Sequence, residues 1–308
     1  MPEICPYSGL SATIFNDEHI FPHALGGGLD YKLRVSKSAN EQFGDSIDVA
    51  LIDSPLIQAV RTELGIRSRS GEPSWRLHGI VKGTDIKVEV TFRRGQDPIL
   101  RVENPVSRDL GDPNVGLISC SQEDFDGFLQ KFIKNHERKG NLVELGPESS
   151  LINEPIEFDL SVDLSVIKRA LAKIAFASLV HYLPQYLQDP LVPEWRKLMS
   201  GSDAEAKQAK VYGTAFDADQ LLPMLFPRLE PYEHAVTVAV LEKPRILVAV
   251  TLFGMNFHHI VAVASERETY GLSSLEGRIA VCDARNRSTR FIDYTDAFRQ
   301  KLLAVYEK

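Results

Sequence analysis

Three polar residues near the N-terminus have the types and the order that metal-assisted hydrolysis of a phosphodiester bond requires. Glu18 and His19 are adjacent, and Asn40 follows later in the chain. Such hydrolysis needs a base that deprotonates water, a cation that stabilises charge on the phosphate, and a protein that aligns them. Because imidazole titrates near neutral pH, His19 is the natural base. Glu18 and Asn40 offer hard oxygens that suit Mg²⁺ or Mn²⁺.

The surrounding sequence predicts a strand, a sharp loop, a second strand and a helix. Residues 18–21 and 33–36 read as the two strands, and apolar residues at four-residue spacing predict a helix over 38–51. The glycine run at 26–28 requires unusual backbone angles or a close approach of chains. Adjacent residues on a regular strand face opposite ways, so Glu18 and His19 need a strand end or a twist to converge. Pro22 and the glycines supply such an irregularity.

Residues 5–48 resemble the core of the HNH endonucleases, the ββα-metal finger. The residues that carry the resemblance are Glu18-His19-Ile20-Phe21-Pro22, Gly26-Gly27, Ala39-Asn40 and Gly44. By that resemblance, Glu18 and Asn40 bind a divalent metal ion, Mg²⁺ or Mn²⁺, and His19 is the general base. The resemblance therefore implies a hydrolase, a divalent-metal-dependent endonuclease that cuts DNA, with RNA as the alternative substrate.

The chain departs from the family pattern at two kinds of position. Many HNH endonucleases bracket the core with two Cys-x-x-Cys knuckles that hold zinc, and here Cys5 is the only cysteine at the corresponding places. Because one thiolate cannot build a tetrahedral zinc site, we expect no structural zinc, and the rest of the chain must brace the finger. Tyr31 stands in the place of the middle Asn of the family motif. Asp45 and Asp48 are either auxiliary ligands of the metal ion or acidic residues on the solvent-exposed face of the helix. We prefer the second interpretation.

The sequence predicts an α+β protein with two domains. We expect an HNH-like nuclease domain over 1–70 and a larger α+β domain with an antiparallel sheet over 76–308, whose role is sensing, targeting or assembly. Its predicted strands cover 77–81, 86–92, 99–102, 235–241, 246–253 and 259–264, and its predicted helices cover 121–137, 164–183 and 294–306. Lys168, Arg169 and Lys173 on the second of these helices either touch nucleic acid or, by default, form a solvated face.

Composition limits the classes of partner. The net charge of -7 over 308 residues argues against a protein that coats nucleic acid through overall positive potential. Basic residues gather between Arg61 and Arg101, either as a phosphate-contacting patch or as a solvated face of mixed charge. Three scattered cysteines, no apolar run long enough for a bilayer and no secretion signal predict a cytoplasmic protein without membrane contact.

Two other hypotheses stay open beside the endonuclease. In the first hypothesis, the finger is a degenerate module that binds nucleic acid or protein without catalysis. The missing cysteines, Tyr31 and the acidic total charge favour this hypothesis. Alternatively, the nuclease is silent until a protein partner, an oligomer contact or a small ligand engages the C-terminal domain. Anti-phage defence is one setting in which HNH domains are joined to regulatory domains, and only that analogy suggests it here.

Overall fold

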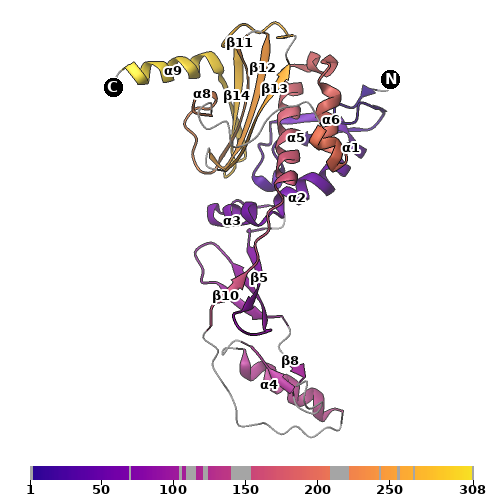
Figure 1. The fold of residues 1–308 in the computed structure, drawn as a ribbon, viewed down its shortest axis with the longest axis vertical. Coiled ribbons are helices and arrows are strands. Elements are labelled where there is room, and N and C mark those ends of the chain that lie inside the picture. Colours follow the sequence, from indigo (N-terminus) through magenta and orange to yellow (C-terminus); the bar gives the residue numbers. More distant parts are fainter. Residues whose placement is uncertain are drawn as a thin grey trace. The chain divides into compact units, whose positions relative to one another are not determined.

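The computed structural model describes residues 3–68, 71–103, 106–108, 116–120, 124–139, 154–208, 222–242, 244–254, 257–265 and 268–306. It contains helices and antiparallel sheets, which confirms the expected α+β class. By its contacts the chain divides into two compact units. Unit 1 comprises residues 1–73 and 162–308, and unit 2 comprises residues 74–161. Each unit is described by itself (Figure 1).

This division differs from the expected boundary between residues 70 and 76. The N-terminal residues share one hydrophobic core with residues 167–284, whereas residues 74–161 form a unit of their own. The region expected to be one domain over 76–308 is therefore divided, and its larger part completes the core of the N-terminal segment. Sequence patterns show only local periodicity, so they could not reveal which distant segments share a core.

The N-terminal segment of unit 1 begins with two small antiparallel pairs. Strands β1 (Glu3–Ile4) and β2 (Ser11–Ala12) pair, and β3 (Phe15–His19) pairs with β4 (Lys32–Ser36). Between β3 and β4 lies a short 3-10 helix, η1 (His23–Leu25), which ends at Gly26 in the left-handed conformation with φ of 84°. Only glycine adopts that conformation without strain, so the glycine run makes the sharp loop that the sequence predicts.

A helical stretch follows β4 directly. Helix α1 (Lys37–Phe43) starts at Ser36, whose hydroxyl accepts a hydrogen bond from the Ala39 amide as an N-cap. It runs on into a π-helical turn, η2 (Gly44–Asp48), then α2 (Val49–Ile52), and α3 (Pro55–Leu64) comes after a turn. The helix expected over 38–51 is therefore confirmed, with one π-helical turn inside it. Such turns shift the helix face by an extra residue and are frequent at functional sites.

A five-stranded antiparallel sheet forms the centre of unit 1, in the order β13-β12-β11-β14-β15. The strands are β11 (Glu233–Glu242), β12 (Arg245–Leu252), β13 (Phe257–Ser265), β14 (Gly277–Asp283) and β15 (Ser288–Asp293). The hairpin β11–β12 and the strand β13 confirm sequence predictions, whereas β14 and β15 were not foreseen. Alternate side chains of β11 and β12 enter two separate hydrophobic clusters, as the period of a strand dictates.

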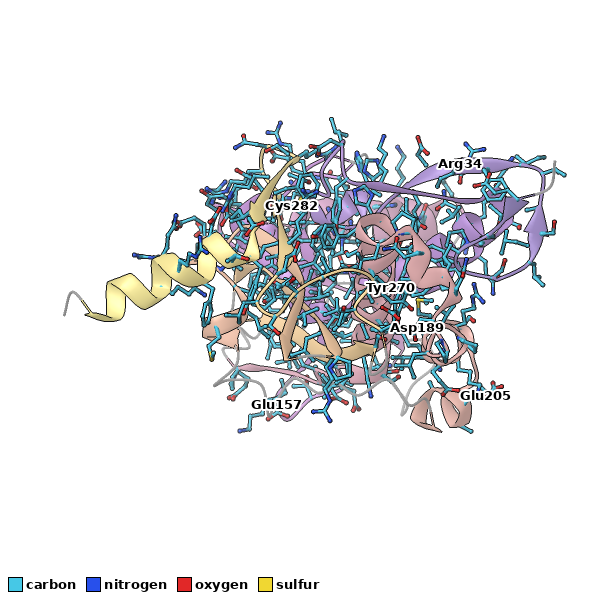
Figure 2. The ribbon with its side chains drawn as sticks, turned by 90° about the horizontal axis from the view of Figure 1, so that it is seen from above. Arg34, Glu157, Asp189, Glu205, Tyr270 and Cys282 are labelled. Atoms are coloured by element: carbon cyan, nitrogen blue, oxygen red, sulfur yellow. The ribbon has the colours of Figure 1, made fainter. Side chains whose placement is uncertain are left out.

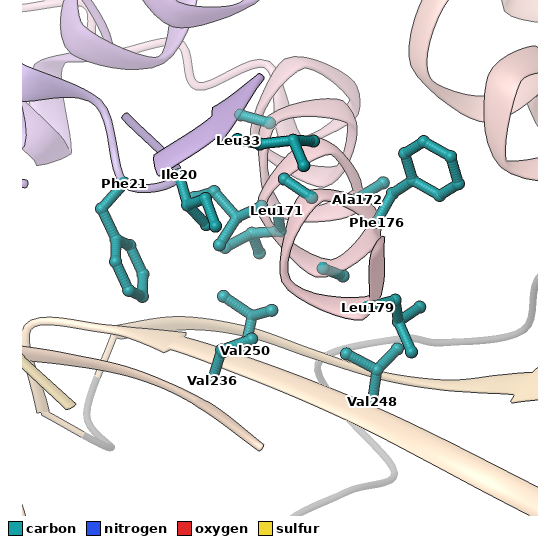
Figure 3. Close-up of a cluster of buried hydrophobic side chains, with 14 of the residues drawn as sticks. Ile20, Phe21, Leu33, Leu171, Ala172, Phe176, Leu179, Val236, Val248 and Val250 are labelled. Carbon is teal, nitrogen blue, oxygen red and sulfur yellow. The ribbon is translucent and has the colours of Figure 1, made fainter. Parts of the chain in front are cut away.

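Helix α5 (Leu164–Tyr182) lies between this sheet and the N-terminal segment (Figures 1 and 3). Leu171 of α5 lies over Val236 and Val250 of the sheet, Leu179 lies beside Val248, and Leu33 of β4 packs from the other side. Because α5 has neighbours on several sides, it is buried on almost its whole surface from Ile167 to Val180. The expected helix is confirmed, but of the three basic residues for which a solvated face was the default, Lys173 is buried, whereas Lys168 and Arg169 are half-buried.

The other elements of unit 1 cover the two faces of this core. The helical turn η3 (Pro184–Gln188), α6 (Val192–Ser200) and α7 (Asp203–Gln208) follow α5, and α8 (Leu222–Leu225) and α9 (Tyr294–Tyr306) pack on the opposite sheet face. A buried chain of hydrogen bonds runs from the Trp195 indole to the Tyr186 hydroxyl and on to the Ala264 carbonyl. The Tyr270 hydroxyl donates to Asp189 at 2.8 Å and ties the loop after β13 to η3 (Figure 2).

Unit 2 contains a four-stranded antiparallel sheet in the order β10-β5-β6-β7. Its strands are β5 (Trp75–Val81), β6 (Lys87–Phe92), β7 (Ile99–Val102) and β10 (Ile156–Phe158). The first three confirm the predicted meander. The unit also holds the pair β8 (Val106–Arg108) and β9 (Gly116–Ile118) and the helix α4 (Phe125–Glu137). Most of the basic residues between Arg61 and Arg101 belong to this unit, but the Arg61 side chain is buried in unit 1.

Candidate functional site

The strand β3 places Glu18 and His19 on opposite faces. Its pairing with β4 is continuous, with Glu18 opposite Leu33 and His19 opposite Lys32. Leu33 faces the core, so Glu18 also points inward and is buried, whereas His19 is only partly buried. The twist that would bring the two side chains to one face does not occur within β3.

The ring of His19 is held by the glycine loop. Its Nδ1 lies 2.9 Å from the Gly28 carbonyl oxygen. A carbonyl only accepts, so Nδ1 carries a proton, and in the corresponding tautomer the lone pair lies on Nε2. Within the described part of the chain, Nε2 makes no hydrogen bond. His19 is therefore oriented as a proton acceptor, with a carbonyl that stabilises the ring when it becomes positively charged.

A second histidine and an arginine lie beside His19. The rings of His19 and His23 meet edge to face, with centroids 5.6 Å apart. The Arg287 guanidinium donates to Nε2 of His23 at 2.6 Å and to the Arg67 carbonyl at 2.7 Å. Arg287 comes from the turn between β14 and β15, and its backbone is left-handed with φ of 53°. This turn adds a positive charge near His19 that sequence reasoning missed, because β14 and β15 were not foreseen.

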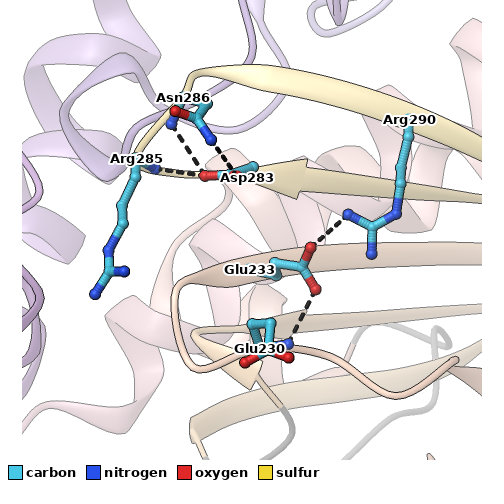
Figure 4. Close-up of polar contacts among 6 residues, drawn as sticks. All are labelled: Glu230, Glu233, Asp283, Arg285, Asn286 and Arg290. Carbon is cyan, nitrogen blue, oxygen red and sulfur yellow. Dashed lines mark hydrogen bonds and ion pairs between the residues drawn. The ribbon is translucent and has the colours of Figure 1, made fainter.

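Carboxylates fix the turn that carries Arg287 (Figure 4). Asp283 accepts hydrogen bonds from the amides of Arg285 and Asn286 at 2.9 and 3.0 Å, a common way to hold a tight turn. On the neighbouring strands, Glu233 pairs with Arg290 across β14. The position of the Arg287 side chain is thus set by the sheet of unit 1.

Asn40 meets a residue that sequence reasoning did not select. Its side-chain nitrogen donates to Oδ1 of Asn16 at 3.0 Å, at the surface between α1 and β3. Asn16 lies two residues before Glu18 and therefore on the same face of β3. The two positions are about 7 Å apart along the strand, at roughly 3.4 Å per residue. Strand alternation counted back from Glu18 would have found Asn16.

The Glu18 carboxylate is bound by a lysine from helix α5. The Lys173 ammonium forms ion pairs with Oε1 of Glu18 and with Oδ2 of Asp48, the latter at 2.7 Å, and it lies 5.9 Å from the centre of the Tyr7 ring. The side chains of Lys173, Glu18 and Asp48 are 1%, 6% and 15% exposed. We call these four residues the Lys173 cluster.

Burial and charge act against each other in the Lys173 cluster. Burial raises the pKa of Glu18 and that of Asp48 above their ordinary values, although the Lys173 charge opposes the rise in both. Burial alone would lower the pKa of Lys173, but the two carboxylates outweigh it and the pKa is raised, so the ammonium form persists at neutral pH. Burial, followed by the charge of Glu18, also raises the pKa of Tyr7.

The preferred interpretation of Asp48 and Lys173 as solvated residues is wrong. Asp48 lies in the π-helical turn η2, and it turns toward the core and Lys173. Lys173 is buried because α5 is covered by the sheet and by the N-terminal segment. In contrast, Asp45 is exposed, as expected for a solvated helix acid.

The two places that the sequence resemblance equates with zinc knuckles, at Cys5 and Ser36, come together in space. The Ser36 amide donates to the Cys5 sulfur at 3.3 Å, and hydrogen bonds from Ser36 and Ser8 outweigh burial and lower the pKa of Cys5. Cys5 is fully buried, with Ser36 beside it. These positions therefore hold a small hydrogen-bonded cluster with one sulfur. Tyr31 is also buried and packs against Phe21 and His181.

The oxygen atoms near Glu18 suit a hard divalent ion in kind, although the Lys173 ammonium already pairs with the single carboxylate among them. Both carboxylate oxygens of Glu18 are buried, and Tyr7 forms a hydrogen bond with this carboxylate in addition to the Lys173 ion pair. Asn16 and Asn40 add amide oxygens on the same side of β3. No cluster of three or more His, Cys, Asp or Glu side chains that could hold a metal occurs in the described ranges. One carboxylate with two amides fits Mg²⁺, which commonly keeps several waters and uses substrate phosphate as a further ligand.

Comparisons of the chain with family models, with curated proteins and with solved structures found no match. No helix among the described residues is long and apolar enough to cross a membrane. The function is therefore argued from the residues of the site alone.

Proposed function

We propose that this protein is an endonuclease of the HNH type that hydrolyses phosphodiester bonds in DNA. The single observation that supports it most is the geometry of His19, whose Nδ1 is fixed by the Gly28 carbonyl and whose Nε2 is left to accept a proton. The order β3, glycine loop, β4 and α1 agrees with the strands and helix of the proposed finger. The contact of Cys5 with Ser36 agrees with the proposed correspondence to a zinc knuckle.

In this proposal His19 acts as the general base. Nε2 takes a proton from a water molecule, and the resulting hydroxide attacks phosphorus while the bond to the leaving oxygen breaks. The Gly28 carbonyl then stabilises the positively charged ring. Arg287, held beside His23, contributes positive charge that attracts the substrate phosphate. Solvent protonates the leaving oxygen.

A divalent ion is part of the proposal. Glu18 and Asn40 would hold Mg²⁺ or Mn²⁺, with Asn16 as an additional oxygen donor. When bound, such an ion supplies stabilisation of negative charge on the phosphate and the leaving oxygen.

A direct test is cleavage of plasmid DNA, and of RNA, by the purified protein with Mg²⁺ or Mn²⁺. Substitution His19→Ala should lower the rate on the order of 10²- to 10⁴-fold, the usual contribution of a general base. His181→Ala is a matched control, because His181 also places Nδ1 2.9 Å from a backbone carbonyl but lies on α5. Equal cleavage by wild type and His19→Ala would contradict the proposal.

The second candidate function is a binding module without catalysis. The burial of Glu18 against Lys173 favours it, because this contact occupies one oxygen of the proposed metal ligand. It predicts that the protein binds DNA without cutting it, and that the double substitution Glu18→Ala with His19→Ala retains function in cells. Loss of cellular function in a double variant that remains folded would contradict this candidate.

A further inference from the structure

The Lys173 cluster is the feature that the proposed function does not use. A lysine side chain is seldom fully buried, and here it lies at the back of the proposed metal ligand Glu18. It reaches that position from helix α5, far away in the sequence. The cluster carries two carboxylates and one ammonium, so its net charge is negative by one unit when all three groups are ionised.

The carboxylates of the cluster are only partly compensated by the ammonium. Lys173 contacts Oε1 of Glu18 and Oδ2 of Asp48. The Glu18 carboxylate also forms a hydrogen bond with the Tyr7 side chain, whereas Oδ1 of Asp48 is buried without a hydrogen-bond partner in the part of the chain that the structure describes. Buried carboxylate oxygens without partners are costly and favour a second positive group. The ammonium repels a second cation at the same carboxylate, so Lys173 and a divalent ion oppose each other there.

We infer that Lys173 is the resident cation of this centre and limits the binding of divalent metal at Glu18, so that metal is retained only together with a substrate phosphate. The inference rests on the proposed function, because it concerns the same metal ligand. With Lys173 and Tyr7 in contact with the Glu18 carboxylate, this carboxylate and two amides hold a dication weakly. A substrate phosphate adds negative charge and oxygen ligands, which complete the coordination that Mg²⁺ requires.

The test measures binding of Mn²⁺ by electron paramagnetic resonance, without any cleavage step. The wild-type protein should bind Mn²⁺ weakly in the absence of DNA. Lys173→Met keeps the length of the side chain and removes its charge, so its affinity for Mn²⁺ should rise on the order of tenfold or more. The gain should disappear when Glu18→Gln is added. Lys168→Met on the same helix is the matched control and should bind Mn²⁺ as wild type does.

Several results would overturn the inference. One is tight binding of one Mn²⁺ by the wild-type protein without DNA that is lost in Glu18→Gln. Another is a folded Lys173→Met protein whose Mn²⁺ affinity is unchanged or lower, as a purely structural lysine predicts. Should Lys173→Met fail to fold, the wild-type and Glu18→Gln titrations still decide, and Lys173→Gln provides a polar uncharged replacement.

A second measurement tests the proposed function independently of the inference about Lys173. In a His19→Ala background, which prevents cleavage, a short DNA duplex should strengthen Mn²⁺ binding. If DNA has no such effect while Lys173→Met still gains affinity, the nuclease proposal fails but Lys173 remains the cation that limits metal binding at Glu18. If DNA strengthens binding and Lys173→Met gains nothing, the nuclease proposal survives and the inference about Lys173 fails.

Discussion

A buried histidine makes the stability of unit 1 dependent on pH. His234 of β11 is 0% exposed, and both ring nitrogens have backbone partners. Nε2 lies 2.9 Å from the Leu25 carbonyl and therefore carries the proton, while Nδ1 accepts from the Phe253 amide at 3.1 Å. Burial, opposed by the bond to Leu25, lowers the pKa of His234 to about 4. The folded state thus holds a neutral ring that joins the glycine loop to the sheet.

The sign and size of the effect follow from proton linkage. The unfolded state, with a histidine pKa of about 6.5, binds the proton at higher pH than the folded state, so acid favours unfolding. The contribution of His234 is fully present above about pH 6.5 and is lost as the pH falls toward the folded-state value of about 4. A shift of about 2.5 pH units corresponds to roughly 3 kcal/mol, of which about 2 kcal/mol is lost between about pH 7.5 and 5.

The assay is urea unfolding at these two pH values for wild type and for His234→Gln, whose amide cannot be protonated. The variant should be less stable at the higher pH. The difference in the free energy of unfolding between the two proteins should shrink by about 2 kcal/mol at the lower pH. Leu179→Ala is the control, because it removes buried methyl groups but no titratable atom. Its loss of unfolding free energy relative to the wild type should be the same at both pH values. If the loss of unfolding free energy in His234→Gln is equal at both pH values, His234 does not make the stability of unit 1 dependent on pH.

Three further predictions concern the N-terminal segment. A Cβ atom at Gly26 would lie 2.2 Å from a backbone oxygen of the β14–β15 turn, at a φ of 84°; thus Gly26→Ala should lower the free energy of unfolding by about 2 to 4 kcal/mol in denaturant titrations. At the helical Gly44 nothing lies within 4 Å of such an atom, so Gly44→Ala should instead stabilise by about 0.5 to 1 kcal/mol, and equal effects of the two variants would contradict this comparison. Asn16→Ala should raise the Mg²⁺ concentration needed for half-maximal cleavage about tenfold. An unchanged Mg²⁺ concentration would contradict a role of Asn16 as an oxygen donor to the metal. Cys5→Ala should fold without zinc, and a chelator should leave the Tm of the wild type unchanged, whereas a fall in Tm would reveal a structural metal.

Local structure was predictable wherever one short-range signal dominated. The hydrophobic spacing of residues 164–183 and the apolar alternation of residues 235–253 predicted α5 and the hairpin β11–β12. The glycine run predicted the sharp loop after η1, because positive φ at Gly26 is a property of the residue type. In contrast, β14 and β15 were missed, since the apolar run of β14 covers only residues 279–282 and β15, at the edge of the sheet, mixes polar and apolar residues.

The sequence alone determined the kinds of chemical group in the site and their order along the chain. Glu18, His19 and Asn40 could be selected from their types, and strand alternation already required Glu18 and His19 to face opposite ways unless the strand was irregular. Only the tertiary structure decided what each of them contacts. The long helix α5 packs between the sheet and β4, and this packing brings Lys173 to Glu18. Arg287 reaches His23 because the sheet places the β14–β15 turn against the glycine loop. These contacts join residues far apart in the sequence, so they depend on the packing of whole elements, which no local pattern records.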